Sequence, residues 1–145
     1  AAALGSSLGL DSSESFSLGL LHDLGLLGLA VWQGEGYRER LHSFSSPPPK
    51  DERSEFGVDH TQAGLALLIY RGFSTSLCEA SAFHHGDLER ISVSARIAAC
   101  AWKIAESDCE GAKSCSGVLG LSDEGVAKAV NSVGAARSGI ASLFG

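Results

Sequence analysis

The hydrophobic and polar positions of the chain repeat with a helical period over most of its length. The most apolar segment is FSLGLLHDLGLLGLAVW at residues 16–32, where the only charged or ionisable side chains are the adjacent pair His22 and Asp23. We predict one continuous helix through this whole segment, begun by Asp11 as the capping residue with Glu14 in the first turn. Such a pair is costly inside an apolar helix unless backbone hydrogen bonds, a counter-charge or a metal ion satisfies it.

Apolar residues at steps of three and four predict further helices on both sides of this segment. The helices predicted besides the apolar one span residues 1–9, 37–44, 58–70, 74–84, 88–105 and 122–144. Residues 45–50 (SSPPPK) and 106–120 are predicted loops, and the charged residues 51–55 are expected to be exposed. Gly64 should let another helix approach closely. Since no segment shows the alternation of a strand, we predict an all-α fold, a bundle of about five to seven helices.

Length and charge narrow the class of protein. A chain of 145 residues with 44% hydrophobic residues is predicted to form a single domain over residues 1–145. The formal net charge of −6 provides no basic stripe, which argues against nucleic-acid and anionic-membrane partners. His22 and Asp23 argue against a membrane span at residues 16–32, and no signal peptide is evident, so we expect a cytoplasmic protein. The chain holds no methionine, and we expect further chain upstream of residue 1.

The four cysteines lack C-x-x-C spacing, so reduced thiols are the expected state. A disulfide between Cys109 and Cys115, allowed by the intervening Gly111, is the alternative.

Ionisable side chains gather at helix or helix-end positions. They are His22, Asp23, His60, His84 and His85. Imidazole nitrogens and carboxylate oxygens are ligands of zinc, iron and manganese, and helical bundles build metal sites by bringing such groups together from several helices. The alternative is that these residues, like His42, are ordinary surface or hydrogen-bonded histidines.

Four motifs in order carry a resemblance to a known family. They are GLLHDLG at residues 19–25, FGVDHTxxG at residues 56–64, AFHH at residues 82–85 and GLSDE at residues 120–124. Together they resemble the HD superfamily and, within it, the C-terminal half of an HDOD domain, a regulatory module of bacterial signalling proteins. The resemblance runs from about Leu8 to the helix that Ser122 begins, and it implies an HD-like helical bundle.

The resemblance implies roles for the clustered residues. His22 and Asp23 match the pair that binds metal in active phosphohydrolases of the superfamily. His60, His84 and His85 match positions that complete a multinuclear centre in the related HD-GYP phosphodiesterases. Such a centre would hydrolyse a phosphoester of a nucleotide or cyclic dinucleotide, with a divalent iron, manganese or zinc ion.

Departures from the family pattern favour a different function. Residues 1–21 contain no histidine, Leu26 replaces a frequent lysine, no Gly-Tyr-Pro follows His85, and Arg96 stands where an aspartate is expected. A guanidinium repels a metal ion, and we predict a salt bridge between Arg96 and Asp23 instead.

We therefore predict a signal-transduction module without catalysis or cofactor, in which the metal site has degenerated. Its expected partners are signalling proteins, including an upstream HDOD half or a fused domain. A metal-dependent phosphohydrolase is the alternative, and a metal-binding module without turnover is the third hypothesis.

Overall fold

The computed structural model describes residues 1–43, 49–107 and 115–144, and in these ranges the chain is helical and has no strand. The helices are α1 (Ala2–Ser7), α2 (Ser12–Leu21), α3 (Leu24–Trp32), α4 (Glu35–Ser43), α5 (Pro49–Phe56), α6 (His60–Tyr70), α7 (Thr75–Phe83), α8 (Val93–Ser107) and α10 (Asp123–Phe144). The all-α prediction is confirmed. The described part holds more helices than the five to seven expected, because the helix predicted over residues 16–32 is divided and residues 49–56 form a helix that was not predicted.

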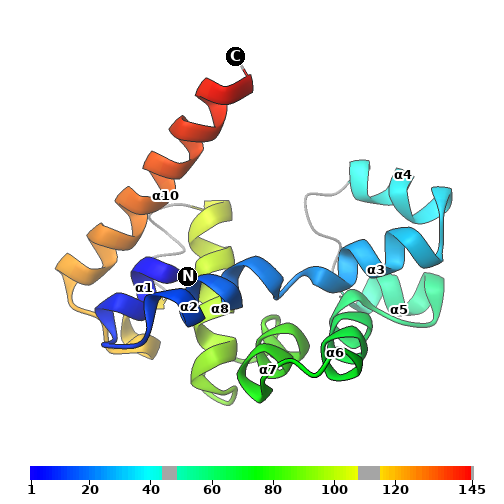
Figure 1. The fold of residues 1–145 in the computed structure, drawn as a ribbon, viewed down its shortest axis with the longest axis horizontal. Coiled ribbons are helices and arrows are strands. Elements are labelled where there is room, and N and C mark those ends of the chain that lie inside the picture. Colours follow the sequence, from blue (N-terminus) through cyan, green and yellow to red (C-terminus); the bar gives the residue numbers. More distant parts are fainter. Residues whose placement is uncertain (44–48, 108–114, 145) are drawn as a thin grey trace.

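The helices form two neighbouring groups (Figure 1). α1, α2, α8 and α10 gather around one end, and α3 to α6 form the other. α7 joins the groups, because it packs against α6 on one side and against α2 and α8 on the other. The main core lies among α1, α2, α6, α7 and α8 and includes Leu4, Leu18, Leu68, Leu77, Ile97 and Ile104. The site described below lies where α3, α6 and α7 meet.

The prediction of one continuous helix over residues 16–32 is wrong. α2 ends at Leu21 and α3 begins at Leu24, with His22 and Asp23 between them. The chain turns there because Asp23 leaves helical geometry, with φ −98° and ψ 16°. A straight helix would point these two adjacent side chains about 100° apart, whereas the turn directs both into one site.

The apolar stretch Ser12–Trp32 is long and apolar enough to cross a membrane by length and composition alone. Only 28% of its most apolar window is buried inside the protein. Since a core helix of a soluble protein passes the same test, this is weak evidence, and the cytoplasmic location stays a prediction.

Side-chain caps begin helices where the sequence predicts them. Asp11 accepts a hydrogen bond from the Glu14 amide at 2.8 Å, and Ser74 begins α7 by accepting from the Leu77 amide at 3.4 Å. Ser122 accepts from the Gly125 amide at 3.2 Å at the start of α10. These bonds satisfy amides that the first helical turn leaves without partners.

The segment after the prolines differs from the prediction. α5 begins at Pro49, which is suited to a first helical turn because its ring fixes φ and it needs no amide partner. Within this helix Glu52 is fully buried, although the sequence indicated an exposed charged segment. Two further boundaries differ: α8 begins at Val93 rather than residue 88, and residues 115–119 are helical rather than loop.

Three cysteines of the described residues are buried thiols: Cys78, Cys100 and Cys115. Cys109 lies outside the described residues, as do the loop residues 44–48.

Candidate metal centre

Asp23 lies at the centre of a cluster of imidazoles from three helices. It precedes α3, while His60 is the first residue of α6 and His84 caps the C-terminus of α7, followed by His85. One ligand atom from each of these four residues lies within 4.8 Å of the ligand atoms of the other three. The fold thus brings together residues that are up to 62 positions apart, as Asp23 and His85 are.

The two carboxylate oxygens of Asp23 face different imidazoles. Oδ1 lies 3.1 Å from Nε2 of His84 and 3.8 Å from Nε2 of His60, while Oδ2 lies 3.2 Å from Nε2 of His22. Both oxygens of this partly buried carboxylate thus face imidazole nitrogens.

Three imidazoles are held in one tautomer by their other ring nitrogen. Nδ1 of His22 lies 2.8 Å from the Gly19 carbonyl oxygen, and Nδ1 of His84 lies 2.9 Å from that of Ser81. Nδ1 of His60 lies 2.5 Å from a carboxylate oxygen of Glu52. Since these oxygens only accept hydrogen bonds, each Nδ1 carries a proton, and the neutral form of each ring has its lone pair on Nε2, the nitrogen nearest Asp23.

Glu52 and Tyr37 belong to the site, and the sequence did not indicate either of them. Glu52 accepts hydrogen bonds from the Tyr37 hydroxyl and, at 2.9 Å, from the His60 amide. Burial opposes ionisation of Glu52, but the bonds from His60 and Tyr37 prevail and lower its pKa. Burial and the neighbouring carboxylate raise the pKa of Tyr37 above its usual range. A helical reading of residues 49–56 would have placed Glu52 one turn from Phe56, the apolar side chain of this segment, but the prolines argued against a helix there.

His85 lies between the imidazoles of the cluster and an indole of α8. Its Nε2 lies 3.0 Å from Nε2 of His60, and its ring stands edge-on to Trp102 of α8 with centroids 5.1 Å apart. Burial, and then the charges of His84 and His60, lower the pKa of His85 to about 4. His85 is thus a neutral imidazole at neutral pH, the form that binds metals.

The donor set fits a divalent transition-metal ion. Nε2 of His22, Nε2 of His84 and Oδ1 of Asp23 are buried, and none has a hydrogen-bond partner of acceptable geometry. The ion-pair distances of 3.1 and 3.2 Å are short, but lone pairs that face a carboxylate repel it, and a cation between them would remove that cost. The 3.0 Å between His60 and His85 matches the spacing of adjacent ligands about 2.1 Å from one octahedral ion, roughly 3.0 Å.

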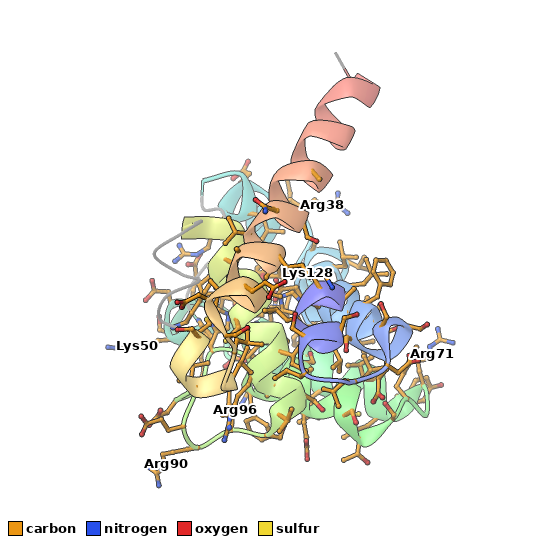
Figure 2. All side chains as sticks on the ribbon, turned by 90° about the vertical axis from the view of Figure 1, so that its left-hand side faces the viewer. Arg38, Lys50, Arg71, Arg90, Arg96 and Lys128 are labelled. Carbon is orange, nitrogen blue, oxygen red and sulfur yellow. The ribbon has the colours of Figure 1, made fainter. Side chains whose placement is uncertain are left out.

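The predicted salt bridge between Arg96 and Asp23 is wrong. Nε of Arg96 donates to the Ile91 carbonyl oxygen at 3.0 Å, and Nη2 donates to that of Glu89 at 3.3 Å. The ion pairs of Asp23 are with His22, His60 and His84. Figure 2 shows Arg96 at the edge of the molecule near Arg90. Its guanidinium satisfies the loop before α8 and does not displace a cation from the cluster.

Comparison with protein families identifies the family of the chain. Residues 1–86, more than half of the 145, match the HDOD domain family. The chain belongs to the HDOD family, whose HD-like domains are associated with signalling. No curated protein and no solved structure shows significant similarity to the chain.

The extent of the family match corrects one prediction. The match covers the N-terminal part of the chain and ends at Gly86, so it includes His22, Asp23, His60, His84 and His85 but not Arg96. It therefore does not support the predicted likeness to a C-terminal half extending to the helix after Ser122. The correspondence of Arg96 to a family aspartate lies beyond the matched residues.

Proposed function

We propose that this protein is a regulatory module of signal transduction that acts through protein contacts and binds one divalent transition-metal ion without hydrolysing a substrate. The metal-binding part of this proposal rests on one observation, the convergence of imidazole nitrogens on the Asp23 carboxylate. Family membership supports the regulatory role. A location in the cytoplasm is part of the same proposal.

The composition of the cluster supports binding without turnover. Its described ligand atoms are those of one carboxylate and three imidazoles, and the side chain that α8 brings against His85 is the indole of Trp102. An indole cannot bind a metal ion through its N–H. This aromatic contact closes one side of the cluster.

Exposed apolar side chains support action through protein contacts. On α2, Phe16 and Leu20 are one helical turn apart and are 58% and 65% exposed, and on α3 Leu27 and Val31 repeat this arrangement at 65% and 79%. Contiguous exposed apolar surface marks sites of protein interaction, and we propose that these four side chains belong to such a surface. The chemistry fits apolar surfaces of a signalling partner.

A metal-dependent phosphohydrolase is the second candidate, and the accessibility of the cluster favours it. The Asp23 side chain is 25% exposed, so a phosphate ester could approach the carboxylate. An ion held by Asp23, His60, His84 and His85 would supply the positive charge that polarises a phosphate ester.

Metal analysis and an activity screen separate these functions. The purified protein is stripped with a chelator, reloaded with manganese, iron or zinc, desalted and analysed by mass spectrometry, with Asp23→Asn as the binding-deficient variant and exposed Asp87→Asn as its matched control. About one ion per chain, lost in Asp23→Asn and kept in Asp87→Asn, supports the proposal.

The same loaded samples are assayed for hydrolysis of phosphomonoesters, nucleotides and cyclic dinucleotides. Turnover that Asp23→Asn abolishes would replace the proposal with the phosphohydrolase. Absence of bound metal in the wild type would contradict both metal-binding functions and leave a module without metal.

A further inference from the structure

A buried chain of hydrogen bonds extends from the candidate metal centre to α4 and α5. The Tyr37 hydroxyl of α4 donates to one oxygen of Glu52, and Nδ1–H of His60 donates to the other oxygen at 2.5 Å. Tyr37, Glu52 and His60 are each 0% exposed. The centre is therefore linked to α4 and α5 by a path that water does not reach.

Glu52 has donors from both sides and no freedom to turn. One oxygen receives the Tyr37 hydroxyl, while the other receives both the amide and Nδ1 of His60. A buried carboxylate without such donors would be strongly unfavourable, so its presence requires that α4, α5 and the start of α6 stay together.

The opposite nitrogen of His60 belongs to the metal cluster. Nε2 lies 3.0 Å from His85 and 3.8 Å from Asp23, while Nδ1 faces Glu52. Any group that pulls electrons from Nε2 strengthens the bond from Nδ1–H to the carboxylate, because the two nitrogens share one aromatic ring. His60 thus connects the metal cluster at Nε2 with the Glu52 carboxylate at Nδ1 through a single aromatic ring.

The remaining contacts hold α4 to α5. The rings of Tyr37 and Phe56 meet edge to face with centroids 5.2 Å apart, and Arg40 pairs with Glu55 at 2.7 Å. Glu55 is on the same helix as Glu52, one turn later. Its side chain is 45% exposed, and its ion-pair partner is Arg40 rather than His60. Because an ion pair with this exposure contributes little to stability, Glu55 provides a matched control for the buried carboxylate.

We propose that Glu52, supported by Tyr37, is the positioning residue of His60, and that through it metal occupancy and the docking of α4 and α5 stabilise each other. This inference rests on the proposed metal-binding function. Because coupling between two sites is reciprocal, weakening the Glu52 contact must lower metal affinity, and metal binding must protect α4 and α5. The surface formed by α4 and α5 is then the part of the module that reports the state of the centre.

The test compares wild type with Glu52→Gln, Tyr37→Phe and the control Glu55→Gln. Binding of Mn²⁺ alone is measured by electron paramagnetic resonance, and hydrogen exchange is followed in peptides covering residues 35–43 and 49–56 with and without Mn²⁺. Nitrogen NMR of the metal-free full chain determines which nitrogen of His60 carries the proton.

We expect Glu52→Gln to weaken Mn²⁺ binding by roughly 10-fold to 100-fold, as loss of an outer partner of a metal-binding histidine does. Tyr37→Phe should weaken it less, and Glu55→Gln should bind as wild type does. Mn²⁺ should slow exchange in both peptides of wild type and of Glu55→Gln, but not in Glu52→Gln. In the metal-free wild type the proton of His60 should reside on Nδ1.

Equal Mn²⁺ binding and equal protection in wild type and Glu52→Gln would overturn the inference while leaving the metal-binding function intact. If wild type binds no metal, the proposed function fails. The role of Glu52 in positioning His60 is then tested only by the NMR measurement of which His60 nitrogen carries the proton. A proton on Nδ1 that the Tyr37→Phe variant shifts toward Nε2 supports it, and a proton on Nε2 in wild type overturns it.

Discussion

Gly25 of α3 lies directly against the backbone of Gly64 in α6. A Cβ placed on Gly25 would lie 2.6 Å from the Gly64 nitrogen and 1.8 Å from the carbonyl oxygen of His60. Neither distance is compatible with a side chain, so the two helices approach to backbone contact only because both positions are glycine. This contact confirms the close approach predicted at Gly64 and places Asp23, two residues before Gly25, beside His60.

Gly25→Ala should therefore damage both the fold and the site. The new methyl group meets backbone that cannot turn away, so we expect the free energy of unfolding to fall by about 1–3 kcal/mol or more, measured by urea denaturation. Gly36→Ala in α4 is the matched control, because a Cβ there meets nothing within 4 Å. That variant should be neutral or up to about 1 kcal/mol more stable. Similar stability of the two variants would contradict the backbone contact.

Divalent metal should raise the melting temperature of the wild type, and Asp23→Asn should abolish the effect. An ion that binds only the folded state adds about 2.7 kcal/mol of stability at a concentration 100 times its dissociation constant. Thermal melts with manganese, zinc or excess chelator measure this shift. The exposed carboxylate of Asp87 supplies the control, Asp87→Asn, whose shift should equal that of wild type. A shift that persists in Asp23→Asn would place the ion elsewhere.

Arg96→Gln should leave metal binding unchanged and lower stability slightly. The variant shortens the side chain and removes the bonds from the guanidinium to the carbonyls of Ile91 and Glu89, which we expect to cost about 1 kcal/mol. Metal content and denaturation of the same preparation measure the two effects. A changed metal affinity would show that the guanidinium influences the cluster despite lying away from it.

The metal-free protein should lose stability between about pH 6.5 and pH 4 because of His85. The folded state lowers the pKa of His85 to about 4 from the ordinary value of 6.5, so over this range the unfolded chain binds more protons. Stability therefore falls as pH decreases through this window and is unaffected by His85 above it. Melting temperatures of wild type and His85→Gln in excess chelator, from pH 7.5 to pH 4.5, test this. Parallel curves for the two proteins would contradict the assigned pKa.

The sequence alone determined the helical class and several helix ends. Helix starts at Asp11, Ser74 and Ser122 were predictable because a cap depends on residues three positions apart. The turn at Gly72, where φ is +72°, was equally local. The motifs around His22 and His84 also led to the correct family.

Tertiary structure decided the rest of the candidate site. The break at His22 and Asp23 turns both side chains toward imidazoles from α6 and α7, which no local pattern contains. Glu52 became a buried partner of His60 because α5 packs at the start of α6, although its neighbours in sequence are charged and exposed. Arg96 turned to nearby carbonyls rather than to Asp23. Local sequence fixes caps and periodicity because they depend on neighbouring residues, whereas the partner of a buried charge depends on which helices the whole fold brings together.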